Sequence, residues 1–404
     1  MRRVVVTGIG VVSSIGIGKD QFWQNLIKGK SGISRIESFD TSNFPSHFGG
    51  EIKNFRPEEF INKHKVKLLG RASQLAIAAA KLALSDAGLK ISEVEQKSYG
   101  ICVGTTMGEI QLMEEIDSTW VKDGHEEVKF LSIASFPSSN ISSSLALELK
   151  FNGENFVMPT ACAAGNYSIG YGFDLIRSNK NPEIVLAGGV DAFSKVAYTG
   201  FSRLYAMASE KCQPFDKNRK GMMVGEGAAI VVLESLESAK KRKAPIYAEI
   251  LGYGLSCDAH HMTQPTEDGI AKCMIKALKE SGIKADDIDY ISAHGTGTQQ
   301  NDKTEVAAIK KVFGKNYKKI PVSSIKSMLG HPMGAASAIE AAVCCLALKE
   351  GIVPPTINYE TPDPECDIDC VPNKSRKQKI NIALNNSYAF GGNNACLVMK
   401  QHED

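Results

Sequence analysis

The sequence predicts a layered α/β fold made of two similar halves. Along the first half, short runs rich in β-branched residues alternate with longer helical patterns, which is typical of helices packed on a sheet. The alternation starts again after Tyr253, and a length of 404 residues exceeds that of one ordinary domain. We therefore expect an N-terminal half at 1–252 and a C-terminal half at 253–404.

The expected elements follow in chain order. In the first half, strands are expected at 4–7, 100–104, 155–158, 184–187, 229–234 and 246–252. Helices are expected at 71–87, where alanine and leucine dominate, and at 163–177, where small residues allow close approach to neighbours. In the second half, helices are expected at 268–281 and 303–313, and strands at 290–293, around Val322, at 382–386 and at 396–400. Residues 354–379 carry five prolines and several charges, which predicts a long surface excursion.

Composition narrows the class of protein. Lys and Arg total 47 and Asp and Glu total 45, so no whole-molecule field favours nucleic acid or an anionic membrane. No stretch approaches the roughly 20 uninterrupted apolar residues that a spanning helix needs, so we expect no membrane span. Thr7, Gly8 and Gly10 interrupt the apolar N-terminal run, which favours a buried strand over a signal peptide. Ten cysteines at irregular spacings predict reduced thiols and therefore a cytoplasmic protein.

The first motif that carries chemistry places a thiol at the start of a helix. Cys162 follows the strand at 155–158 and a turn at 159–161, and it opens the small-residue helix. The partial positive charge of a helix N-terminus lowers the pKa of a thiol there, and the unpaired N–H groups can hold an oxyanion. Because free cysteine is among the most buried residue types, Cys162 is either a nucleophile or a structural core residue.

Three further motifs can carry chemistry. His294 opens a His-Gly-Thr-Gly-Thr run directly after a strand, where an imidazole would project into a cleft. His331 lies in a Lys-Ser-Met-Leu-Gly-His-Pro run that begins at Lys326 and precedes a helix of small residues. Residues 385–394 form a glycine turn after a buried strand, where backbone N–H groups can approach a ligand closely. Each motif has a structural alternative, but unrelated folds would rarely reproduce all of them in this chain order.

Together, these motifs resemble those of the β-ketoacyl-acyl-carrier-protein synthases of the thiolase superfamily, most closely the synthase II type and its relatives in type II polyketide systems. The likeness extends from the Val-Val-Val-Thr-Gly-Ile-Gly run at 4–10 to the Phe-Gly-Gly run at 390–392. It implies an α/β fold of the thiolase-like, duplicated, five-layered αβαβα type. The N-terminal half would carry the cysteine, the C-terminal half would carry the two histidines, and the site would lie between them.

The resemblance also implies a role for each central residue. Cys162 would be the acylated nucleophile, and His294 and His331 would drive malonyl decarboxylation and stabilise the resulting enolate. Lys326 would orient charge around the histidines, and Glu340 would hold that lysine. The alternative for Glu340 is a solvated carboxylate on a helix.

Other positions match substrate contacts in the same family. Thr296 and Thr298 would contact the phosphopantetheine arm, and their alternative is a role as plain β-branched turn residues. Phe390 would be a gate whose N–H joins that of Cys162 in the oxyanion hole. Two apolar side chains would line the acyl pocket or belong to the core, namely Met107 and Phe201.

The reaction implied is a decarboxylative Claisen condensation of an enzyme-bound acyl group with a malonyl-acyl-carrier protein, which is acyltransferase chemistry. Substrates would arrive on the phosphopantetheine of an acyl carrier protein, with no metal or diffusible cofactor. A dimer is expected, either of two identical chains or with a related ketosynthase-like subunit, in fatty-acid, polyketide or polyene synthesis. Relatives usually carry more arginine near Lys65, Lys67 and Tyr205, where carrier proteins dock, whereas Arg71 and Arg203 supply the nearby charge here.

Other functions fit the sequence less well. A non-catalytic partner of the chain-length-factor kind typically lacks the nucleophile, whereas Cys162 is present here with both histidines. A dinucleotide-binding fold would need a third glycine where Ser13 stands. A degradative thiolase would need a second cysteine in the final glycine turn, where Phe390 stands instead.

Overall fold

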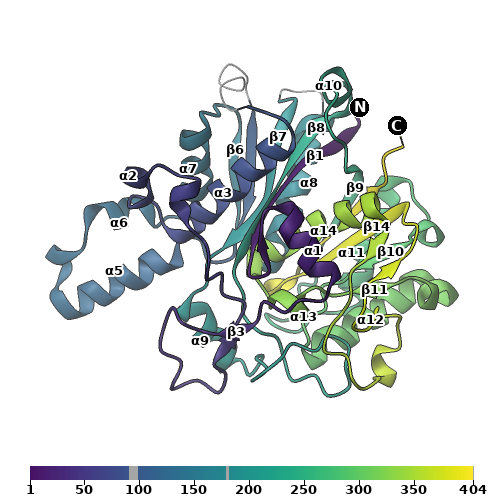
Figure 1. Ribbon diagram of the computed structural model, residues 1–404. Helices are drawn as coiled ribbons and strands as arrows, with labels where there is room; N and C mark the ends of the chain where they lie inside the picture. The colour runs from purple at the N-terminus through teal and green to yellow at the C-terminus, as the bar shows by residue number, and fades with distance from the viewer. Residues whose placement is uncertain (91–98, 179–181, 404) are drawn as a thin grey trace.

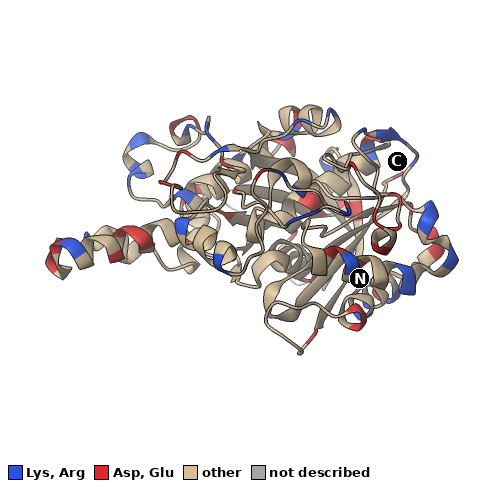
Figure 2. Ribbon diagram, turned by 90° about the horizontal axis from the view of Figure 1, so that it is seen from below, with Lys and Arg blue, Asp and Glu red and all other residues tan. Residues whose placement is uncertain are grey.

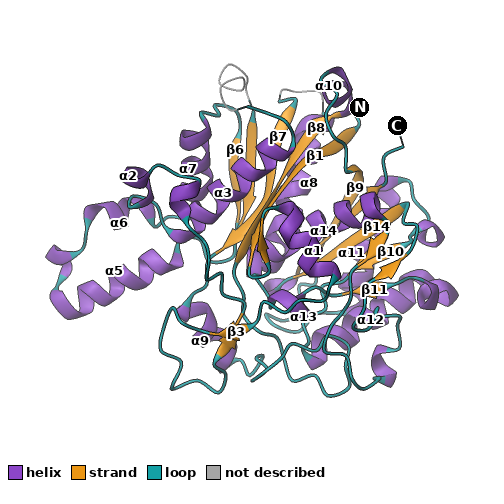
Figure 3. Ribbon diagram, viewed as in Figure 1, coloured by secondary structure: helices purple, strands orange, loops and turns teal. Residues whose placement is uncertain are grey.

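A long sheet runs through the computed structural model, which describes residues 1–90, 99–178 and 182–403 (Figures 1 and 3). From one end to the other, the strands are β11 (Val322–Ser323), β10 (Tyr290–Ser292), β14 (Ile382–Tyr388), β15 (Asn393–Lys400), β9 (Ala248–Cys257), β1 (Val4–Ser13), β8 (Gly227–Ser235), β7 (Ile184–Asp191), β5 (Gly100–Gly104) and β6 (Asn155–Met158). Strand β2 (Gly16–Ile17) pairs with β1 off this path. The N-terminal and C-terminal parts of the sheet are joined by the pairing of β1 with β9, which spans three residue pairs.

Helices cover both faces of the N-terminal part of the sheet. On one face, α3 (Arg71–Asp86) and α7 (Ser139–Leu149) share a hydrophobic cluster with residues of β5, β7 and β8. On the other face lies α8 (Ala164–Arg177). All eight residues of β7 are buried, as expected for a strand that is covered on both sides.

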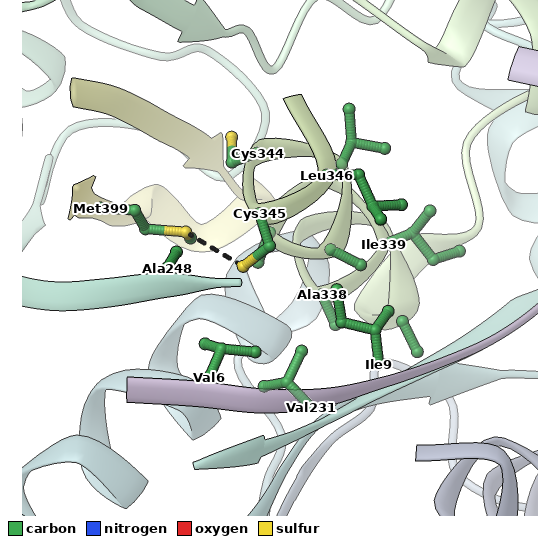
Figure 4. Packing of buried hydrophobic residues seen from close by; sticks show 14 of the residues in the cluster. Val6, Ile9, Val231, Ala248, Ala338, Ile339, Cys344, Cys345, Leu346 and Met399 are labelled. Atoms are coloured by element: carbon green, nitrogen blue, oxygen red, sulfur yellow. Dashed lines mark hydrogen bonds between the residues drawn. The ribbon is translucent and has the colours of Figure 1, made fainter. Parts of the chain in front are cut away.

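Two helices form the central layer between the two parts of the sheet. These are α8 and α14 (Ala336–Glu350), and every residue of α14 as far as Leu348 is buried, so this helix is covered on all sides. Figure 4 shows Ile339 and Cys345 of α14 in the same hydrophobic cluster as Val6 of β1 and Val231 of β8. Gly165 allows the close approach of the two helices, because a Cβ there would lie 2.5 Å from the backbone nitrogen of Ala338.

Two further helices cover the outer face of the C-terminal part of the sheet. They are α11 (Glu267–Ser281) and α12 (Gln299–Phe313), and they share a third hydrophobic cluster with β10, β14 and β15. The order of layers is therefore helix, sheet, helix, sheet and helix. This confirms the prediction of a thiolase-like, five-layered αβαβα fold.

The predicted elements are present, but several are longer than expected. Strands β5 and β6 match their predicted bounds, whereas β1 continues to Ser13 through the glycines that interrupt its apolar run. Those glycines let α3 pack closely, because a Cβ on Gly10 would lie 1.9 Å from the carbonyl oxygen of Ala79. Strand β9 spans Ala248–Cys257, so the expected boundary between positions 252 and 253 falls inside it. Helix α8 begins at Ala164, after a 3₁₀ turn at Ala161–Ala163.

The prediction of a surface excursion at 354–379 is only partly right. Seven of its residues are buried, namely Pro354, Pro355, Thr356, Asp363, Cys366, Cys370 and Val371. The side chain of Asp216 accepts hydrogen bonds from the backbone N–H groups of Glu360 and Thr361, both at 2.6 Å, and so holds the segment against the body. The prolines indicate an irregular segment, but they carry no information about the distant carboxylate that anchors it.

A helical arm extends away from the body and was not expected (Figures 1 and 2). It consists of α5 (Ile110–Asp123) and α6 (Phe130–Ser135). The remaining elements are α1 (Lys19–Ile27), α2 (Lys63–Val66), α9 (Lys195–Arg203), α10 (Leu236–Lys241), α13 (Lys326–Leu329) and the two-residue strands β3 (Ser34–Arg35), β4 (Phe48–Gly49), β12 (Ile352–Val353) and β13 (Arg376–Lys377). Acidic and basic residues are interspersed along the ribbon in Figure 2. Within the described ranges, no helix combines the length and the apolar character that crossing a bilayer requires.

Candidate active site

Cys162 is held in a strained turn between β6 and α8. The residue before it, Ala161, has a φ of 49°, a left-handed conformation that is unusual for a residue with a Cβ. The carbonyl oxygen of Cys162 accepts hydrogen bonds from the hydroxyls of Ser337 at 3.1 Å and Ser387 at 2.9 Å. Both serines belong to the C-terminal part of the chain, so the nucleophile is fixed by both halves. Sequence reasoning missed these two serines, because a hydroxyl that binds a distant carbonyl leaves no local signal.

Two histidines from separate loops meet the thiol of Cys162. The Nε2 atom of His331 lies 3.1 Å from Cys162 Sγ, and the ring centroids of His294 and His331 are 5.4 Å apart. One ligating atom of each of the three residues lies within 4.8 Å of the other two. All three side chains are buried. The structure therefore brings together the three residues that the sequence predicted for the chemistry.

The backbone around each histidine is fixed by other parts of the chain. The N–H of His331 donates to the carbonyl of Met223 at 2.6 Å. The side chain of Glu305, on α12, accepts from the N–H groups of His294 at 2.9 Å and Gly295 at 2.8 Å. Burial raises the pKa of Glu305 to about 7. Sequence reasoning missed Glu305, although its position eleven residues after His294, on the helix that follows this motif, is a signal that could have identified it.

Lys326 and Glu340 form a buried ion pair beside the histidines. Their Nζ and Oε1 atoms are in contact, and each side chain is only 1% exposed. Glu340 is therefore not the solvated helical carboxylate that the sequence left open. Burial raises the pKa of Glu340 to about 7, and the neighbouring ammonium of Lys326 opposes that rise.

The electrostatics of the site favour neutral imidazoles and a protonated thiol. Burial lowers the pKa of both His294 and His331 well below the ordinary histidine value, and the charge of Lys326 lowers it further. Burial raises the pKa of Cys162 to about 12, although Lys326 acts in the opposite direction. The expectation that the helix N-terminus lowers the pKa of this thiol is therefore wrong, because burial of the sulfur outweighs it. The resting site is a thiol next to a neutral imidazole that can accept its proton.

A cavity of about 380 Å³ leads from the surface to Cys162. It is lined by both histidines and by Thr296, Thr298, Phe201 and Phe390, which were predicted to contact substrate, together with residues such as Tyr205 and Met262. The hydroxyl oxygens of the two threonines are 2.9 Å apart. Phe390 is 38% exposed, and the centroid of its ring lies 5.8 Å from that of Phe201.

Met107 is the predicted substrate contact that does not line this cavity. It packs instead at the edge of a cluster of aromatic and methionine side chains that includes Met222 and Met333, and Phe201 belongs to both the cluster and the cavity wall. The predicted docking charge of Arg71 is also engaged. Its guanidinium binds Glu226 through two nitrogens, at 2.8 and 2.7 Å. Arg71 is therefore committed to a buried carboxylate.

The low histidine pKa values predict that activity persists as the pH falls. Because the imidazoles stay uncharged when the pH passes the ordinary histidine value of about 6.5, the rate of any reaction that depends on neutral imidazoles at this site should show no acid loss with an apparent pKa near that value. Stability should change instead. Below about 6.5 the histidines of the unfolded chain bind protons while the folded ones do not, which lowers the free energy of unfolding as the pH falls. Glu305 and Glu340, with pKa values raised from 4.5 to about 7, act in the opposite direction between those two values, so we expect the net fall below 4.5, where the glutamates bind protons in both states. A pH–rate profile checks the prediction for the rate, and urea unfolding at each pH checks the prediction for stability. A rate that halves near pH 6.5 would contradict the conclusion that the two histidines stay neutral.

Comparison with known proteins places these observations in a family. Residues 1–239 match the model of the beta-ketoacyl synthase N-terminal domain, and residues 247–360 match that of the C-terminal domain. Two curated relatives are named 3-oxoacyl-[acyl-carrier-protein] synthase 2, from Synechocystis and from Coxiella burnetii. Each is 39% identical to this chain, with at least 99% of both chains covered. The chain belongs to the β-ketoacyl synthase family.

Solved structures agree with this assignment. A chain of the ishigamide ketosynthase/chain length factor is 45% identical and superposes with a TM-score of 0.97 over 100% of both chains. A complex described as a type II PKS acyl-carrier protein with its ketosynthase bound to the hexaketide contains a chain that is 36% identical, with a TM-score of 0.91 over 99% of this chain and 100% of that one. A beta-ketoacyl synthase from Burkholderia phymatum is 32% identical, with a TM-score of 0.93 over 100% of both chains.

Proposed function

We propose that this chain condenses an acyl group bound to Cys162 with a malonyl group on an acyl carrier protein, releasing carbon dioxide and forming a β-ketoacyl-carrier protein. The observation that carries the proposal is the distance of 3.1 Å between His331 Nε2 and Cys162 Sγ, with His294 in the same buried cluster. One thiol can hold the acyl group while two neutral imidazoles face the malonyl thioester. Names of the relatives support the same chemistry.

The first half of the cycle loads the acyl group. The sulfur of Cys162 attacks the acyl thioester and its proton passes to Nε2 of His331. The bond between the acyl carbon and the carrier sulfur then breaks, and the departing carrier thiolate takes that proton from His331, which becomes neutral again. The N–H groups of Cys162 and Phe390 would stabilise the oxyanion that forms at the thioester carbonyl. Carrier and enzyme exchange the acyl group before malonyl enters, so the kinetics are ping-pong.

The second half extends the chain. The bond to the malonyl carboxylate breaks, carbon dioxide leaves, and the electron pair becomes an enolate whose oxygen accepts hydrogen bonds from the two imidazoles. The enolate carbon attacks the Cys162 thioester, the carbon–sulfur bond breaks, and a proton from solvent restores the thiol. Burial keeps the histidines neutral by lowering their pKa values, and the positive charge of Lys326, which is paired with Glu340, lowers these values further.

This cycle needs no metal and no diffusible cofactor, because the substrates arrive already activated as thioesters. A thiol and two imidazoles are also the ligands that zinc prefers, so the cluster has a second interpretation. The match of Cys162, His294 and His331 to the motifs of the β-ketoacyl synthase family favours covalent catalysis over zinc binding. A chelator should therefore leave condensation unchanged. We also place the reaction in the cytoplasm, which is supported by the ten unpaired cysteines.

The proposed pathway is fatty-acid synthesis or the synthesis of a type II polyketide or polyene, since the relatives include both kinds of enzyme. A chain-length-factor role is not favoured, because the nucleophile and both histidines are present and assembled. Within this proposal the chain divides into thiolase-like halves at 1–252 and 253–404. The first half supplies Cys162, and the second supplies both histidines.

The proposed partners are an acyl carrier protein and a second subunit, either identical or ketosynthase-like. The helical arm offers a surface for the subunit, because Trp120 is 60% exposed, Val121 is 86% exposed and Phe130 is 79% exposed. Strand β6 lies at the end of the sheet, and no other strand in the described ranges pairs with its outer edge. Exposed aromatic side chains on an arm and a strand edge of this kind are features that a partner subunit would cover.

Intact-protein mass spectrometry tests the proposed function. The protein is incubated with acyl carriers of different chain length, and we expect a mass increase equal to one acyl group, mapped to Cys162. A subsequent addition of malonyl carrier should remove that mass and yield a β-ketoacyl carrier. Absence of any acyl adduct across the panel would favour the non-catalytic partner instead.

Replacing the gate residue should change which acyl groups are accepted. Phe390 is followed by two glycines with φ values of 83° and 82°, and its exposed ring lies at the cavity wall, so it can move to cover or open the route to Cys162. In Phe390→Ala we expect the preference between short and long acyl carriers to shift by about tenfold while activity remains. The backbone N–H still serves the oxyanion. Competition between the two carriers measures the shift, and an unchanged preference would reduce Phe390 to a packing residue.

A further inference from the structure

Arg219 is a buried arginine behind the wall of the active-site cavity. It lies between α9 and β8, it is 1% exposed, and it is the largest fully buried side chain in the described part of the chain. A guanidinium cannot lose its charge in a protein, so burying it is costly unless every donor finds a partner. The hydrogen-bond partners of Arg219 therefore show which segments it holds together.

The guanidinium joins three separate segments. Its Nη1 donates to the carboxylate of Asp363 and to the carbonyl oxygen of Asp216, the latter at 2.8 Å. Its other two nitrogens reach the loop that follows His294. Nε donates to the carbonyl of Thr298 at 3.3 Å, and Nη2 donates to the carbonyl of Gln299 at 3.2 Å.

The contact between Arg219 and this loop is reciprocal. The side-chain amide of Gln299 donates to the carbonyl of Arg219 at 2.7 Å, and the N–H of Gly221 donates to the carbonyl of Gly297 at 3.0 Å. The loop from Thr296 to Gln299 is therefore attached to the 216–221 segment at several points. Thr296 and Thr298 line the cavity, while the carbonyls of Thr298 and Gln299 accept hydrogen bonds from Arg219.

The partly buried excursion supplies the counter-charge. Asp363 belongs to the segment at 354–379, and the bonds from Asp216 to the N–H groups of Glu360 and Thr361 bring it into position. Asp302 adds a second carboxylate, with Oδ2 at 3.7 Å from Nε of Arg219. Arg219 is thus the point at which the excursion and the threonine loop are held together.

We propose that Arg219 is a positioning residue that holds Thr296 and Thr298 in the orientation that binds the phosphopantetheine arm of the carrier. This inference rests on the proposed function, in which that arm enters the cavity. Lysine cannot replace arginine here, because an ammonium is a point donor and cannot reach two carbonyls and a carboxylate from a planar fork. Arg219 positions the hydroxyls of Thr296 and Thr298. Loss of its guanidinium should therefore weaken binding of the phosphopantetheine arm more than it slows the chemistry at Cys162.

The test measures binding of a non-hydrolysable malonyl-pantetheine amide by calorimetry, in the full-length protein. We expect Arg219→Lys to raise the dissociation constant about tenfold, as the loss of one well-placed hydrogen bond would. Asp363→Asn should raise it less but in the same direction. The rate of Cys162 alkylation by iodoacetamide, which needs no pantetheine, should stay within about twofold of wild type.

The matched control is Arg242→Lys. Arg242 is also paired with a buried carboxylate, that of Glu234, and also donates to a backbone carbonyl, but it lies on the far side of the sheet's N-terminal part, next to Ala87. The Arg242→Lys substitution should lower the melting temperature without changing the dissociation constant of the malonyl-pantetheine amide.

An unchanged dissociation constant in Arg219→Lys, or an equal rise in Arg242→Lys, would overturn the assignment. If Arg219→Lys does not fold, an unchanged dissociation constant in Asp363→Asn would also overturn the assignment. The wild-type control separates this result from the proposed function. A wild-type protein that binds the amide but fails to condense overturns only the proposed function, whereas one that does not bind it overturns the role of Arg219.

Discussion

Replacing Cys162 with alanine is expected to abolish the acyl-enzyme while malonyl decarboxylation continues. The two halves of the reaction use different atoms: the acyl group needs the sulfur, whereas the enolate needs the histidines. The backbone N–H of His331 donates to the carbonyl of Met223, and that of His294 donates to the carboxylate of Glu305, so the backbone position of neither residue depends on the thiol. Removal of one sulfur atom should leave both imidazoles in place.

Two measurements check this prediction. Intact mass after incubation with an acyl carrier should show no adduct in Cys162→Ala, and release of carbon dioxide from malonyl carrier should continue. Cys257→Ala is the matched control, because Cys257 is an exposed thiol whose sulfur lies 3.9 Å from the carbonyl of Gly391 beside the gate. That variant should be acylated normally. An acyl adduct on Cys162→Ala would show that another residue is the nucleophile.

Replacing either histidine should separate loading from extension. In His294→Ala or His331→Ala, the enolate loses a neutral donor in a buried site, and we expect decarboxylation and condensation to fall by about 10²–10³-fold. Loading should persist at least in part. It should suffer more in His331→Ala, because the group 3.1 Å from Cys162 Sγ is lost while burial still raises the pKa of the thiol.

Single-turnover acylation and steady-state condensation, measured on the same variants, resolve the two steps. His47→Ala is a suitable control, because His47 is a partly buried histidine whose Nδ1 lies 3.1 Å from the hydroxyl of Thr41, outside the site. Its condensation rate should match that of wild type. Near-normal condensation in both His294→Ala and His331→Ala would return the two residues to structural roles.

The assembled site explains why these effects should be separable. The thiol lies in the 3₁₀ turn between β6 and α8, and each histidine lies on its own loop later in the chain. Serine hydroxyls from the second half fix the carbonyl of Cys162, while the ion pair of Lys326 and Glu340 lies beside the imidazoles. Each reactive group is thus supported by different contacts.

The sequence by itself determined the type of each layer and the identity of the reactive groups. Periodicity of apolar residues decides whether a segment packs as a helix or a strand, so β5, β6 and the cores of the longer strands could be predicted locally. The motifs around Cys162, His294 and His331 were equally readable, because each is a short run with unusual residue types. The glycines within β1 interrupt its apolar run, and the strand was therefore expected to be shorter than it is. Their role is to let α3 approach the strand closely, which the local sequence does not indicate.

Only the tertiary structure decided which distant groups support that chemistry and what their charge states are. Ser337, Ser387 and Glu305 act through single hydrogen bonds across long stretches of chain, and such bonds leave no periodic pattern. The pKa of Cys162 depends on how completely the folded chain removes water from the sulfur. A helix N-terminus could be read from the sequence, but the burial that overrides it could not, because desolvation is a property of all the surrounding segments together.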